Sequence, residues 1–442
     1  MMNWTQLITN KRLGLEHLHN KQSDIRSDFE RDYDRIIFSA PFRRLQNKTQ
    51  VFPLPGSIFV HNRLTHSLEV STVGRSLGSR VAQKLAERYP DCANHLNQIP
   101  SIVQAACLAH DMGNPPFGHS GEQAIGTFFS EGEGRDFQHF VTPDQWEDFT
   151  HFEGNANAFR LLAHQYLGRR EGGFVLTYST LASIVKYPYE AKYSPAGKQK
   201  FGFFQQDKPL YERIAAELGI RKQVGDERKY ARHPLVYLVE AADDICYELM
   251  DLEDASKLHI ISTDTALQLF LGFFSEERRE HLRVHCDRLE DPNEKLAYLR
   301  SCAIGALVDA CAEAFIACEP QIMVGELQQP LIRQLPEPLG SAYAACADIS
   351  VKQIYRARMV LDIELSGYRV ISELLRCYIH AAFSPTTAYS HQLLNRAPSQ
   401  YDVRAERPYD RILAVLDFIS GMTDVYALDL YRMIQGIEIP KL

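Results

Sequence analysis

The stretch IVQAACLAHDMGNPPFGHSGEQA, residues 102–124, decides the fold of this chain. It begins as an apolar helix, and the dipeptide His110-Asp111 closes that helix. Burying a charged carboxylate costs several kcal/mol unless a cation or a hydrogen-bond donor compensates it. At the end of a helix two adjacent side chains can converge on one ion, which they do less easily in mid-helix. The stretch therefore indicates a helical fold with a metal ion close to its core.

Helical periodicity dominates the rest of the chain. Apolar residues recur at spacings of three and four in residues 67–89, 233–255 and 362–383, which is the pattern of amphipathic helices. Sustained alternation of period two is almost absent. The aromatic, Pro and Gly residues of 186–204 predict at most a short β-hairpin there. We therefore expect an all-α fold.

The composition is that of an ordinary globular protein. Of 442 residues, 45% are hydrophobic and 24% are charged, and no apolar run approaches the ~18 residues that a membrane span requires. The first residues lack the apolar stretch of a signal peptide. The nine cysteines are scattered without a CxxC pair, which favours reduced thiols over disulfides or a zinc knuckle. We expect a cytoplasmic protein with no membrane partner.

The formal net charge of −8 argues against a protein built mainly to coat nucleic acid, because such proteins usually carry an excess of basic residues. Charge alone therefore does not indicate a nucleic-acid partner. An anionic substrate that arrives with a divalent metal ion fits this balance. Four basic residues could still line a local pocket, and these are Arg43, Arg44, Arg63 and Lys186.

Two further segments complete a candidate metal site. HNRLTHSLEV contains His66, and EAADDICYELMDLEDA contains Asp243. With His110 and Asp111 they offer two imidazoles and two carboxylates, a mixture that suits Mn²⁺, Fe²⁺, Co²⁺, Ni²⁺ or Zn²⁺ and suits Mg²⁺ less. Four protein ligands on an octahedral ion leave positions for water and phosphate oxygens. We predict one divalent ion bound by these four residues.

The choice of Asp243 over its neighbour Asp244 rests on helical periodicity. On a helix, Asp244 stacks with Glu240 and Glu248 at a spacing of four, which reads as a solvated acidic stripe. Asp243 instead shares its face with four apolar residues, so it points inward. These four are Val236, Val239, Cys246 and Met250.

With these residues in view, the chain resembles the HD-domain phosphohydrolases, whose signature is H…HD…D. The match is closer to one branch, the deoxyguanosine triphosphate triphosphohydrolases (dGTPases) and their dGTPase-like relatives. We expect an HD-type core at residues 30–260, where the motifs of the metal site lie, and a helical C-terminal portion at residues 261–442 in the same compact unit. The segments that carry the resemblance run almost from end to end: FRRLQNKTQVFP (42–53), NRLTHSLEV (62–70), HDMGNPPFGHSGE (110–122), HFEGNANAFR (151–160), KYP (186–188), YLVEAADDICYELMDLEDA (237–255) and SGMTDVYALDLYR (420–432).

The resemblance implies a reaction and a catalytic set. Such enzymes hydrolyse a dNTP to the deoxynucleoside and intact inorganic triphosphate, with one divalent metal ion per subunit (Mn, Mg, Fe, Co, Ni or Zn). Position by position, His119 and Glu122 match the pair that acts on the α-phosphate and the leaving oxygen. The matching metal ligands are His66, His110, Asp111 and Asp243. Relatives of this kind tend to be oligomers, often hexamers, so we also expect a homo-oligomer.

The resemblance also implies seven substrate contacts. Arg63 matches a phosphate-binding arginine, and Lys186 and Tyr187 match contacts to the triphosphate. Tyr247 and Asp251 match residues near the deoxyribose 3′-hydroxyl. On a helix they also form one inward row with Asp243, at spacings of four and eight. The sugar and the base would be approached by Gln50 and Val51. No motif fixes which base is preferred.

The residues themselves leave two alternatives to a dNTP triphosphohydrolase. One is another HD activity, such as a nucleotidase or a phosphodiesterase acting on an alarmone or a cyclic nucleotide, which the pair Tyr247 and Asp251 disfavours. The other is a nucleotide- or nucleic-acid-binding regulator with little turnover, for which bound dNTP without released triphosphate would be the sign. A P-loop enzyme is excluded, because no GxxxxGK[ST] sequence occurs.

Overall fold

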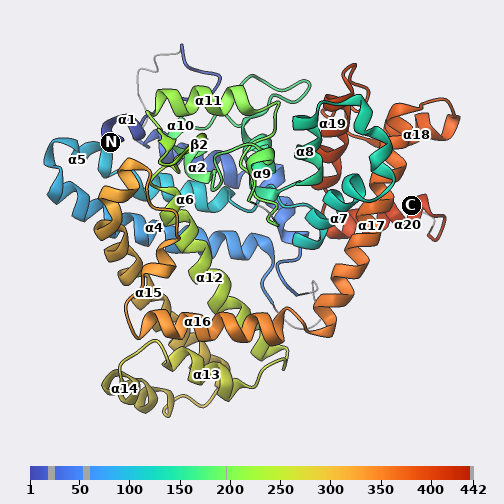
Figure 1. Cartoon of the computed structure of the whole chain (residues 1–442). Coiled ribbons are helices and arrows are strands. Elements are labelled where there is room, and N and C mark those ends of the chain that lie inside the picture. The colour runs from blue at the N-terminus through green and yellow to red at the C-terminus, as the bar shows by residue number, and fades with distance from the viewer. Residues whose placement is uncertain (18–24, 53–59, 196, 439–442) are drawn as a thin grey trace.

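The computed structural model describes residues 1–17, 25–52, 60–195 and 197–438, which fold mainly into helices (Figure 1). The first part of the chain forms α1 (Trp4–Leu7), α2 (Asp28–Ile37), α3 (Ala40–Arg44), α4 (Arg63–Arg88), α5 (Ala93–Leu96) and α6 (Ile99–Ala109). The middle forms α7 (His119–Ser130), α8 (Pro143–Thr150), α9 (Gly154–Ala163), α10 (Tyr178–Ile184), α11 (Lys208–Glu217), β1 (Lys222–Gln223), β2 (Asp226–Tyr230) and α12 (Val236–Lys257). The last part forms α13 (Thr263–Leu271), α14 (Glu276–Cys286), α15 (Pro292–Val324), α16 (Leu339–Ile349), α17 (Arg358–Phe383), α18 (Ala388–Arg396), α19 (Pro408–Ser420) and α20 (Asp424–Ile434). Short helices of other types are η1 (Leu45–Asn47), η2 (Pro90–Cys92), η3 (Glu133–Phe140), η4 (Ala191–Tyr193), η5 (Leu331–Gln334) and the π-helical η6 (Ser350–Ile354).

Local sequence explains where the long helices begin and end. Asp291 caps α15 with its side chain on the Asn293 N–H, and Pro292 occupies the first helical position, where no N–H is needed. Gly325 ends the same helix at φ 79°, the left-handed conformation that glycine adopts without strain. The all-α expectation is confirmed, since the described residues outside β1, β2 and isolated β-bridges form helices, turns and loops.

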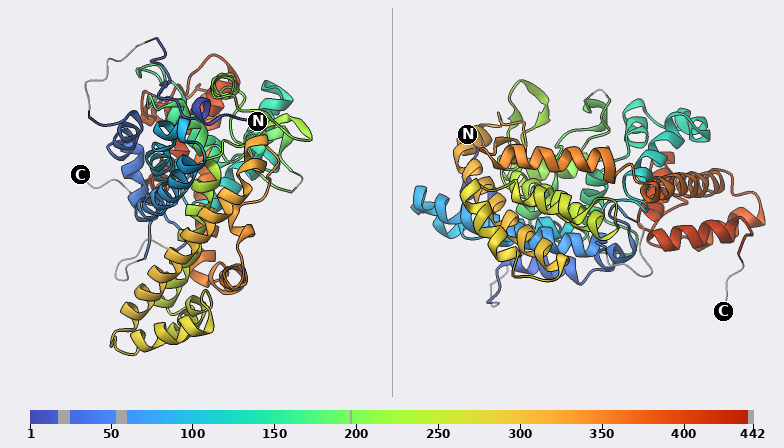
Figure 2. Two further views of the ribbon diagram at one scale, coloured as in Figure 1. Left: turned by 90° about the vertical axis from the view of Figure 1, so that its left-hand side faces the viewer. Right: turned by 90° about the horizontal axis from the view of Figure 1, so that it is seen from below.

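Two hydrophobic cores hold the helices together. In the first, α4 lies against α6, α12 and α15, and α2 and α10 pack on α6. In the second, α7 and α8 pack with the helices from α17 to α20, which form a group at one side of the molecule (Figure 2). The expected boundary between residues 260 and 261 stays a prediction. The second hydrophobic core nevertheless contains residues from both sides of this boundary.

The hairpin does not lie where the sequence indicated. β1 and β2 pair antiparallel, with Lys222 opposite Tyr230, and Gly225 turns between them at φ 82°. The prediction of a hairpin within 186–204 is wrong. The described residues of that segment form loops and the turn η4, where Pro188 and Pro195 have no N–H to donate to a ladder.

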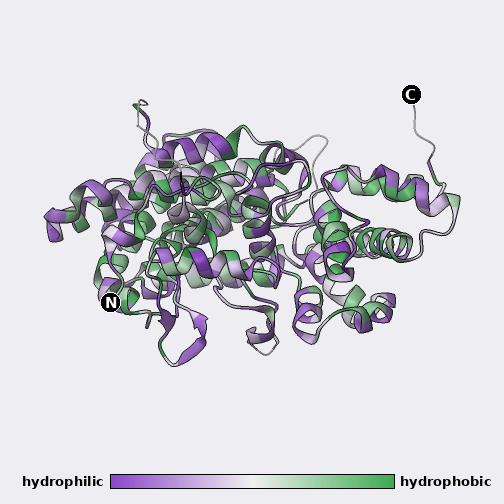
Figure 3. Cartoon of the chain, turned by 90° about the horizontal axis from the view of Figure 1, so that it is seen from above, coloured by the Kyte–Doolittle hydropathy of each residue, from purple (hydrophilic) through white to green (hydrophobic). Residues whose placement is uncertain are grey.

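Helix α15 is long and apolar enough to cross a membrane by length and composition, with a mean hydropathy of 1.7 over 18 residues. The prediction that no apolar run reaches this length is therefore wrong. Here 39% of that window is buried, and α15 packs against α4, α12 and α13. The core helix of a globular protein meets the same criteria, and most helices of this molecule combine hydrophobic and hydrophilic sections (Figure 3).

Candidate active site

Helix α4 presents the first candidate ligand in its first turn. The Asn62 side chain accepts a hydrogen bond from the Thr65 N–H, and the Thr65 side chain accepts one from the Asn62 N–H. This capping box fixes the start of the helix and sets His66 inside the fold, where it is 2% exposed. The centroid of its ring lies 5.4 Å from that of His110.

His110 follows the last residue of α6, and one of its two ring nitrogens is hydrogen-bonded to the backbone. Its Nδ1 lies 2.6 Å from the carbonyl oxygen of Cys107, so Nδ1 carries the hydrogen and a neutral ring presents a lone pair at Nε2. Around that lone pair lie Oδ1 of Asp243 at 3.3 Å and Oδ1 of Asp111 at 3.6 Å. Lone pairs that converge in this way need a cation between them. Nε2 has no hydrogen-bond partner among the residues the structure describes.

Asp243, on α12, faces both imidazoles. Its Oδ1 lies 3.2 Å from Nε2 of His66, and its Oδ2 accepts a hydrogen bond from Nζ of Lys186 at 3.0 Å. The carbonyl oxygen of Asp244 instead accepts a hydrogen bond from the Tyr343 hydroxyl at 3.1 Å, on the side of α16. Asp243 therefore places a carboxylate oxygen within 3.3 Å of Nε2 of both histidines.

The acidic stripe on α12 is not solvated, so that prediction is wrong. Glu240 is buried and accepts a hydrogen bond from Arg232 at 2.8 Å. Glu248 is also buried and accepts one from Ser350 at 2.6 Å. The periodicity of one helix could not reveal this, because Ser350 belongs to the C-terminal portion that covers α12. The same cover buries Asp251, which is 4% exposed.

The donors of this cluster fit a divalent metal ion. His66, His110 and Asp111 each offer a ligand atom, and these atoms lie within 4.8 Å of one another. Burial opposes charge on Asp111, yet Arg63, whose Nη1 donates to Oδ2 at 2.7 Å, holds the pKa of this carboxyl below its usual value. Lys186 and His110 likewise outweigh burial and hold the pKa of Asp243 well below its usual range.

The same two carboxylates act on His110. Burial disfavours its charged ring, but Asp111 and Asp243 raise the pKa of His110 to about 8. A proton at Nε2 therefore balances the negative charge of the two carboxylates, as a metal ion would. Metal binding at this cluster would release that proton, because a ligating imidazole must be neutral.

Helix α7 begins with His119, directly after a glycine that the site requires. Gly118 has φ 58° and ψ −127°, and a Cβ at this position would meet Nη2 of Arg63 at 2.5 Å. His119 is two-thirds exposed, and its Nδ1 lies 2.9 Å from Oε2 of Glu122. This hydrogen bond raises the pKa of His119. Glu122 is buried and held in place by the Gly154 N–H, which donates to Oε1 at 2.7 Å.

His119 borders a cavity of about 1110 Å³, whose other lining residues include Lys186 and Tyr187. Further cations line it, namely Lys198, Lys200, Lys229 and Arg232. No sequence pattern predicted Lys200 and Glu153, which form an ion pair of 2.7 Å beside this cavity. Burial, with the charge of Glu122 nearby, raises the pKa of Glu153. A lone glutamate in HFEGNANAFR carries no spacing signal, so only the fold reveals it.

A residue of the C-terminal portion, Tyr355, contacts the row formed by Asp243, Tyr247 and Asp251. The Tyr355 hydroxyl donates to Oδ2 of Asp251 at 3.0 Å, and its ring centroid lies 6.0 Å from that of Tyr247. The Tyr247 ring lies 6.4 Å from that of His66. Tyr355 directly follows the π-helical turn η6, a distortion that often marks functional sites. It was not predicted, because 104 residues separate it from Asp251.

The segment of Gln50 and Val51 lies beside the start of α4. Thr49 pairs with Asn62 in an isolated β-bridge, and the Thr49 N–H donates to Oδ2 of Asp424 at 2.8 Å. The buried Oε1 of Gln50 has no hydrogen-bond partner in the described residues, as expected of a group kept for a ligand. Among the residues that the structure describes, no hydrogen bond or ring contact joins Gln50 or Val51 to Tyr247 or Asp251.

The four basic residues do not line one pocket. Arg63 and Lys186 each pair with one carboxylate of the histidine cluster. Arg44 lies at a different cavity, and Arg43 is exposed. The prediction of a single pocket shared by these residues is therefore wrong.

Comparison with known proteins agrees with this geometry. Residues 63–218 match the HD domain, and residues 334–433 match the phosphohydrolase-associated domain. A Pseudomonas aeruginosa protein named deoxyguanosinetriphosphate triphosphohydrolase-like protein is 40% identical over 448 residues, with 100% of both chains covered. A Synechocystis protein of the same name is 36% identical, with 99% of this chain and 100% of that protein covered. A Yersinia enterocolitica deoxyguanosinetriphosphate triphosphohydrolase is 31% identical, with 93% and 94% covered.

The helical fold, the His-His-Asp cluster and the HD match together define an HD-domain phosphohydrolase, a metal-dependent class of hydrolase. Within this class, identity over the whole length decides the branch. The chain belongs to the deoxyguanosinetriphosphate triphosphohydrolase-like family.

Proposed function

We propose that this protein hydrolyses deoxynucleoside triphosphates, dGTP first among them, to the deoxynucleoside and inorganic triphosphate. One divalent ion per subunit would be held by His66, His110, Asp111 and Asp243. The names of the relatives support the reaction. The observation that carries the proposal is the unpartnered Nε2 of His110, which faces two carboxylate oxygens next to a second imidazole.

When bound there, the ion would polarise an α-phosphate oxygen and lower the pKa of a coordinated water. A mixed nitrogen and oxygen donor set favours Mn²⁺, Fe²⁺, Co²⁺, Ni²⁺ or Zn²⁺ over Mg²⁺. Arg63 binds phosphate from the other side. Its Nε has no hydrogen-bond partner in the described chain, so this donor is available to a phosphate oxygen.

His119 supplies the proton. Its Nδ1 is held by Glu122, so the protonated ring offers its second N–H, at Nε2, to the departing 5′-oxygen. Water attacks the α-phosphorus, the bond from phosphorus to the 5′-oxygen breaks, and the proton from His119 completes the 5′-hydroxyl. The proton that the water loses replaces the one given by His119. The triphosphate leaves toward the cationic cavity that His119 borders with Lys186 and Tyr187.

The test is incubation of the purified protein with each dNTP and NTP, with Mn²⁺ or Mg²⁺, and separation of triphosphate from pyrophosphate and phosphate. We expect triphosphate and deoxyguanosine from dGTP, and no turnover by Asp111→Ala. Release of pyrophosphate or phosphate would replace this proposal with another phosphohydrolase reaction. Tight dGTP binding without any product would replace it with a regulator.

We also propose a cytoplasmic homo-oligomer. All nine cysteines are free thiols, which suits a reducing compartment. Leu361, Leu365 and Tyr368 form an exposed apolar stripe at spacings of four and three on α17, which suits burial against another copy. Light scattering of the eluting protein tests this, and a monomer at micromolar concentration would refute it.

A further inference from the structure

Lys48 is a buried cation to which the proposed reaction gives no role. It belongs to the segment FRRLQNKTQVFP and is 2% exposed. Its Nζ donates hydrogen bonds to the carbonyl oxygens of Asn114 at 2.5 Å and of Ser420 at 2.8 Å. Burial lowers the pKa of Lys48 to about 7, against the opposing charge of Asp424. Because burying a charge is costly, the two carbonyl groups that Lys48 holds indicate what it does.

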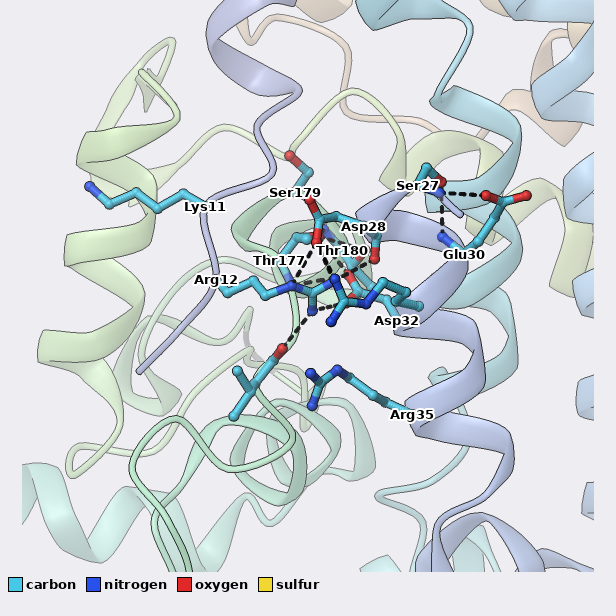
Figure 4. Close-up of polar contacts among 12 residues, drawn as sticks. Lys11, Arg12, Ser27, Asp28, Glu30, Asp32, Arg35, Thr177, Ser179 and Thr180 are labelled. Atoms are coloured by element: carbon cyan, nitrogen blue, oxygen red, sulfur yellow. Dashed lines mark hydrogen bonds and ion pairs between the residues drawn. The ribbon is translucent and has the colours of Figure 1, made fainter. Parts of the chain in front are cut away.

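Arg12 shows how this fold compensates another buried cation. Its Nε donates to Oδ1 of Asp28 at 3.0 Å and its Nη1 to Oδ1 of Asp32 at 2.6 Å, so two carboxylates balance its charge (Figure 4). Within the described residues, Lys48 makes no such ion pair, and its two acceptors lie far apart in the chain. The contacts of Lys48 therefore join two segments, whereas those of Arg12 pair opposite charges.

The first of the two segments supports a candidate metal ligand. Nδ2 of Asn114 donates to Oδ1 of Asp111 at 2.6 Å, and the same oxygen lies 3.6 Å from Nε2 of His110. Lys48 holds the backbone of Asn114 and so limits where this amide can lie. The Lys48 carbonyl oxygen also accepts a hydrogen bond from the Arg63 N–H at 3.3 Å, and Arg63 holds the other oxygen of Asp111. Lys48 thus contacts both hydrogen-bond partners of this carboxylate.

The second segment is the end of α19 in the C-terminal portion. Ser420, the last residue of α19, is 3% exposed and begins the segment SGMTDVYALDLYR, which has no part in the proposed reaction. Asn157, on α9, joins Ser420 to the same loop a second time. Its Nδ2 donates to the carbonyl oxygen of Gly113 at 2.6 Å and to Oγ of Ser420 at 3.1 Å. The cavity beside Lys48, Asn157 and Ser420 measures about 10 Å³, room for one water molecule at most, so this network joins protein segments and leaves no place for a ligand.

Lys48 and Asn157 both connect Ser420 to the loop that follows Asp111. We propose that they are positioning residues, through which the C-terminal portion sets the affinity of the metal site. This inference rests on the proposed function, because it takes Asp111 as a metal ligand. Residues that orient a ligand from behind typically change metal affinity about 10–100-fold when they are replaced, since a ligand that is not held in place must be ordered when the ion binds.

The experiment measures metal affinity directly and needs no turnover. The metal-free full chain is titrated with MnCl₂, and free Mn²⁺ is followed by its electron paramagnetic resonance signal. We expect Lys48→Met and Asn157→Leu each to bind Mn²⁺ roughly tenfold more weakly or worse, because each keeps the size of the side chain and removes its donors. Activity lost at low Mn²⁺ should return at saturating Mn²⁺, because neither substitution touches His119 or Glu122.

Tyr409→Phe is the matched control. The buried Tyr409 hydroxyl donates to Oδ2 of Asp148 at 2.5 Å, so it also joins α19 to the first half of the chain, at α8 and away from the loop after Asp111. This variant should bind Mn²⁺ as the parent does, even if it unfolds at a lower temperature.

The inference is overturned if both test variants keep the parent's affinity for Mn²⁺, or if Tyr409→Phe weakens it as much as they do. A parent protein that binds no Mn²⁺ would remove the metal site of the proposed function and this inference with it. Parent binding with unchanged variants would remove the inference alone, so the two failures can be told apart. Asn157→Leu leaves Lys48 in place, and its titration decides the question if the Lys48 variant does not fold.

Discussion

Replacing Tyr355 by Phe removes a single oxygen atom from the wall of the proposed sugar site. That hydroxyl makes the hydrogen bond of 3.0 Å to Asp251, the one bond to this carboxyl found among the described residues. Burial raises the pKa of Asp251 well above its usual value, so the carboxyl group is favoured in its neutral form and a hydrogen bond to it contributes about 0.5–1.5 kcal/mol. If Asp251 receives the substrate 3′-hydroxyl, Tyr355→Phe should lower kcat/KM for dGTP by roughly 2- to 13-fold. The carboxyl group would lose its fixed position while metal and phosphate binding stay intact.

The assay compares dGTP with 2′,3′-dideoxy-GTP, which has no 3′-hydroxyl. Asp251 has nothing to bind in the dideoxy substrate, so the variant should hydrolyse it at the parent's low rate, and the preference for dGTP should shrink by the same factor. Tyr343→Phe is the matched control, since its hydroxyl also donates to a residue of α12, the backbone carbonyl of Asp244. Equal losses on both substrates, or an equal effect of Tyr343→Phe, would refute the role of Tyr355.

Four further predictions follow from the site. Asp111→Ala should lose the bound metal, measured by elemental analysis, and roughly 10³-fold or more of activity while keeping its helical circular dichroism; a metal-replete variant would contradict the ligand assignment. Since the hydrogen bond that His119 donates to Glu122 raises the pKa of His119, the acid form persists to higher pH, and activity is lost as pH rises through that pKa. Glu122→Gln should therefore move the alkaline limb of the pH–rate profile to lower pH, besides slowing the chemical step about 10²–10⁴-fold; an unmoved limb would show that His119 is not the acid. If the Tyr247 ring packs against the deoxyribose, it leaves little room for a 2′-hydroxyl, so GTP should be hydrolysed far more slowly than dGTP, and equal rates would remove the sugar-site assignment. Gly118→Ala should lower Tm by several degrees, since an added Cβ strains a positive φ and meets Arg63; a stability equal to the parent's would show that the loop accommodates the change.

What the sequence predicted well was local. The face of α12 that carries Asp243 could be read from apolar spacing, because Asp243 lies within one continuous helix of 22 residues. The run of apolar residues before His110 likewise predicted a helix that ends at the site. Both inferences depend on the spacing of apolar residues over a few helical turns, which can be counted directly in the sequence.

The features that the sequence did not predict depend on contacts between segments far apart in the chain. The spacing of Glu240 and Glu248 indicated a solvated stripe, but other elements cover this part of α12. The periodicity of one helix does not show which of its residues another segment will bury. The hairpin was misplaced for a related reason. The paired segments around Gly225 are short and polar, without the alternation that marks a half-buried strand.

Asp424, near the end of the chain, has a consequence for synthesis. Its two carboxylate oxygens hold the N–H groups of Thr49 and Phe117, which lie beside Gln50 and Gly118. A nascent chain that has already emerged past residue 218 contains the whole HD match but not this clamp. The loops around the metal cluster therefore receive their last support only when residue 424 leaves the ribosome. Catalytic competence should arrive as a late event of translation, and truncated products should be inactive.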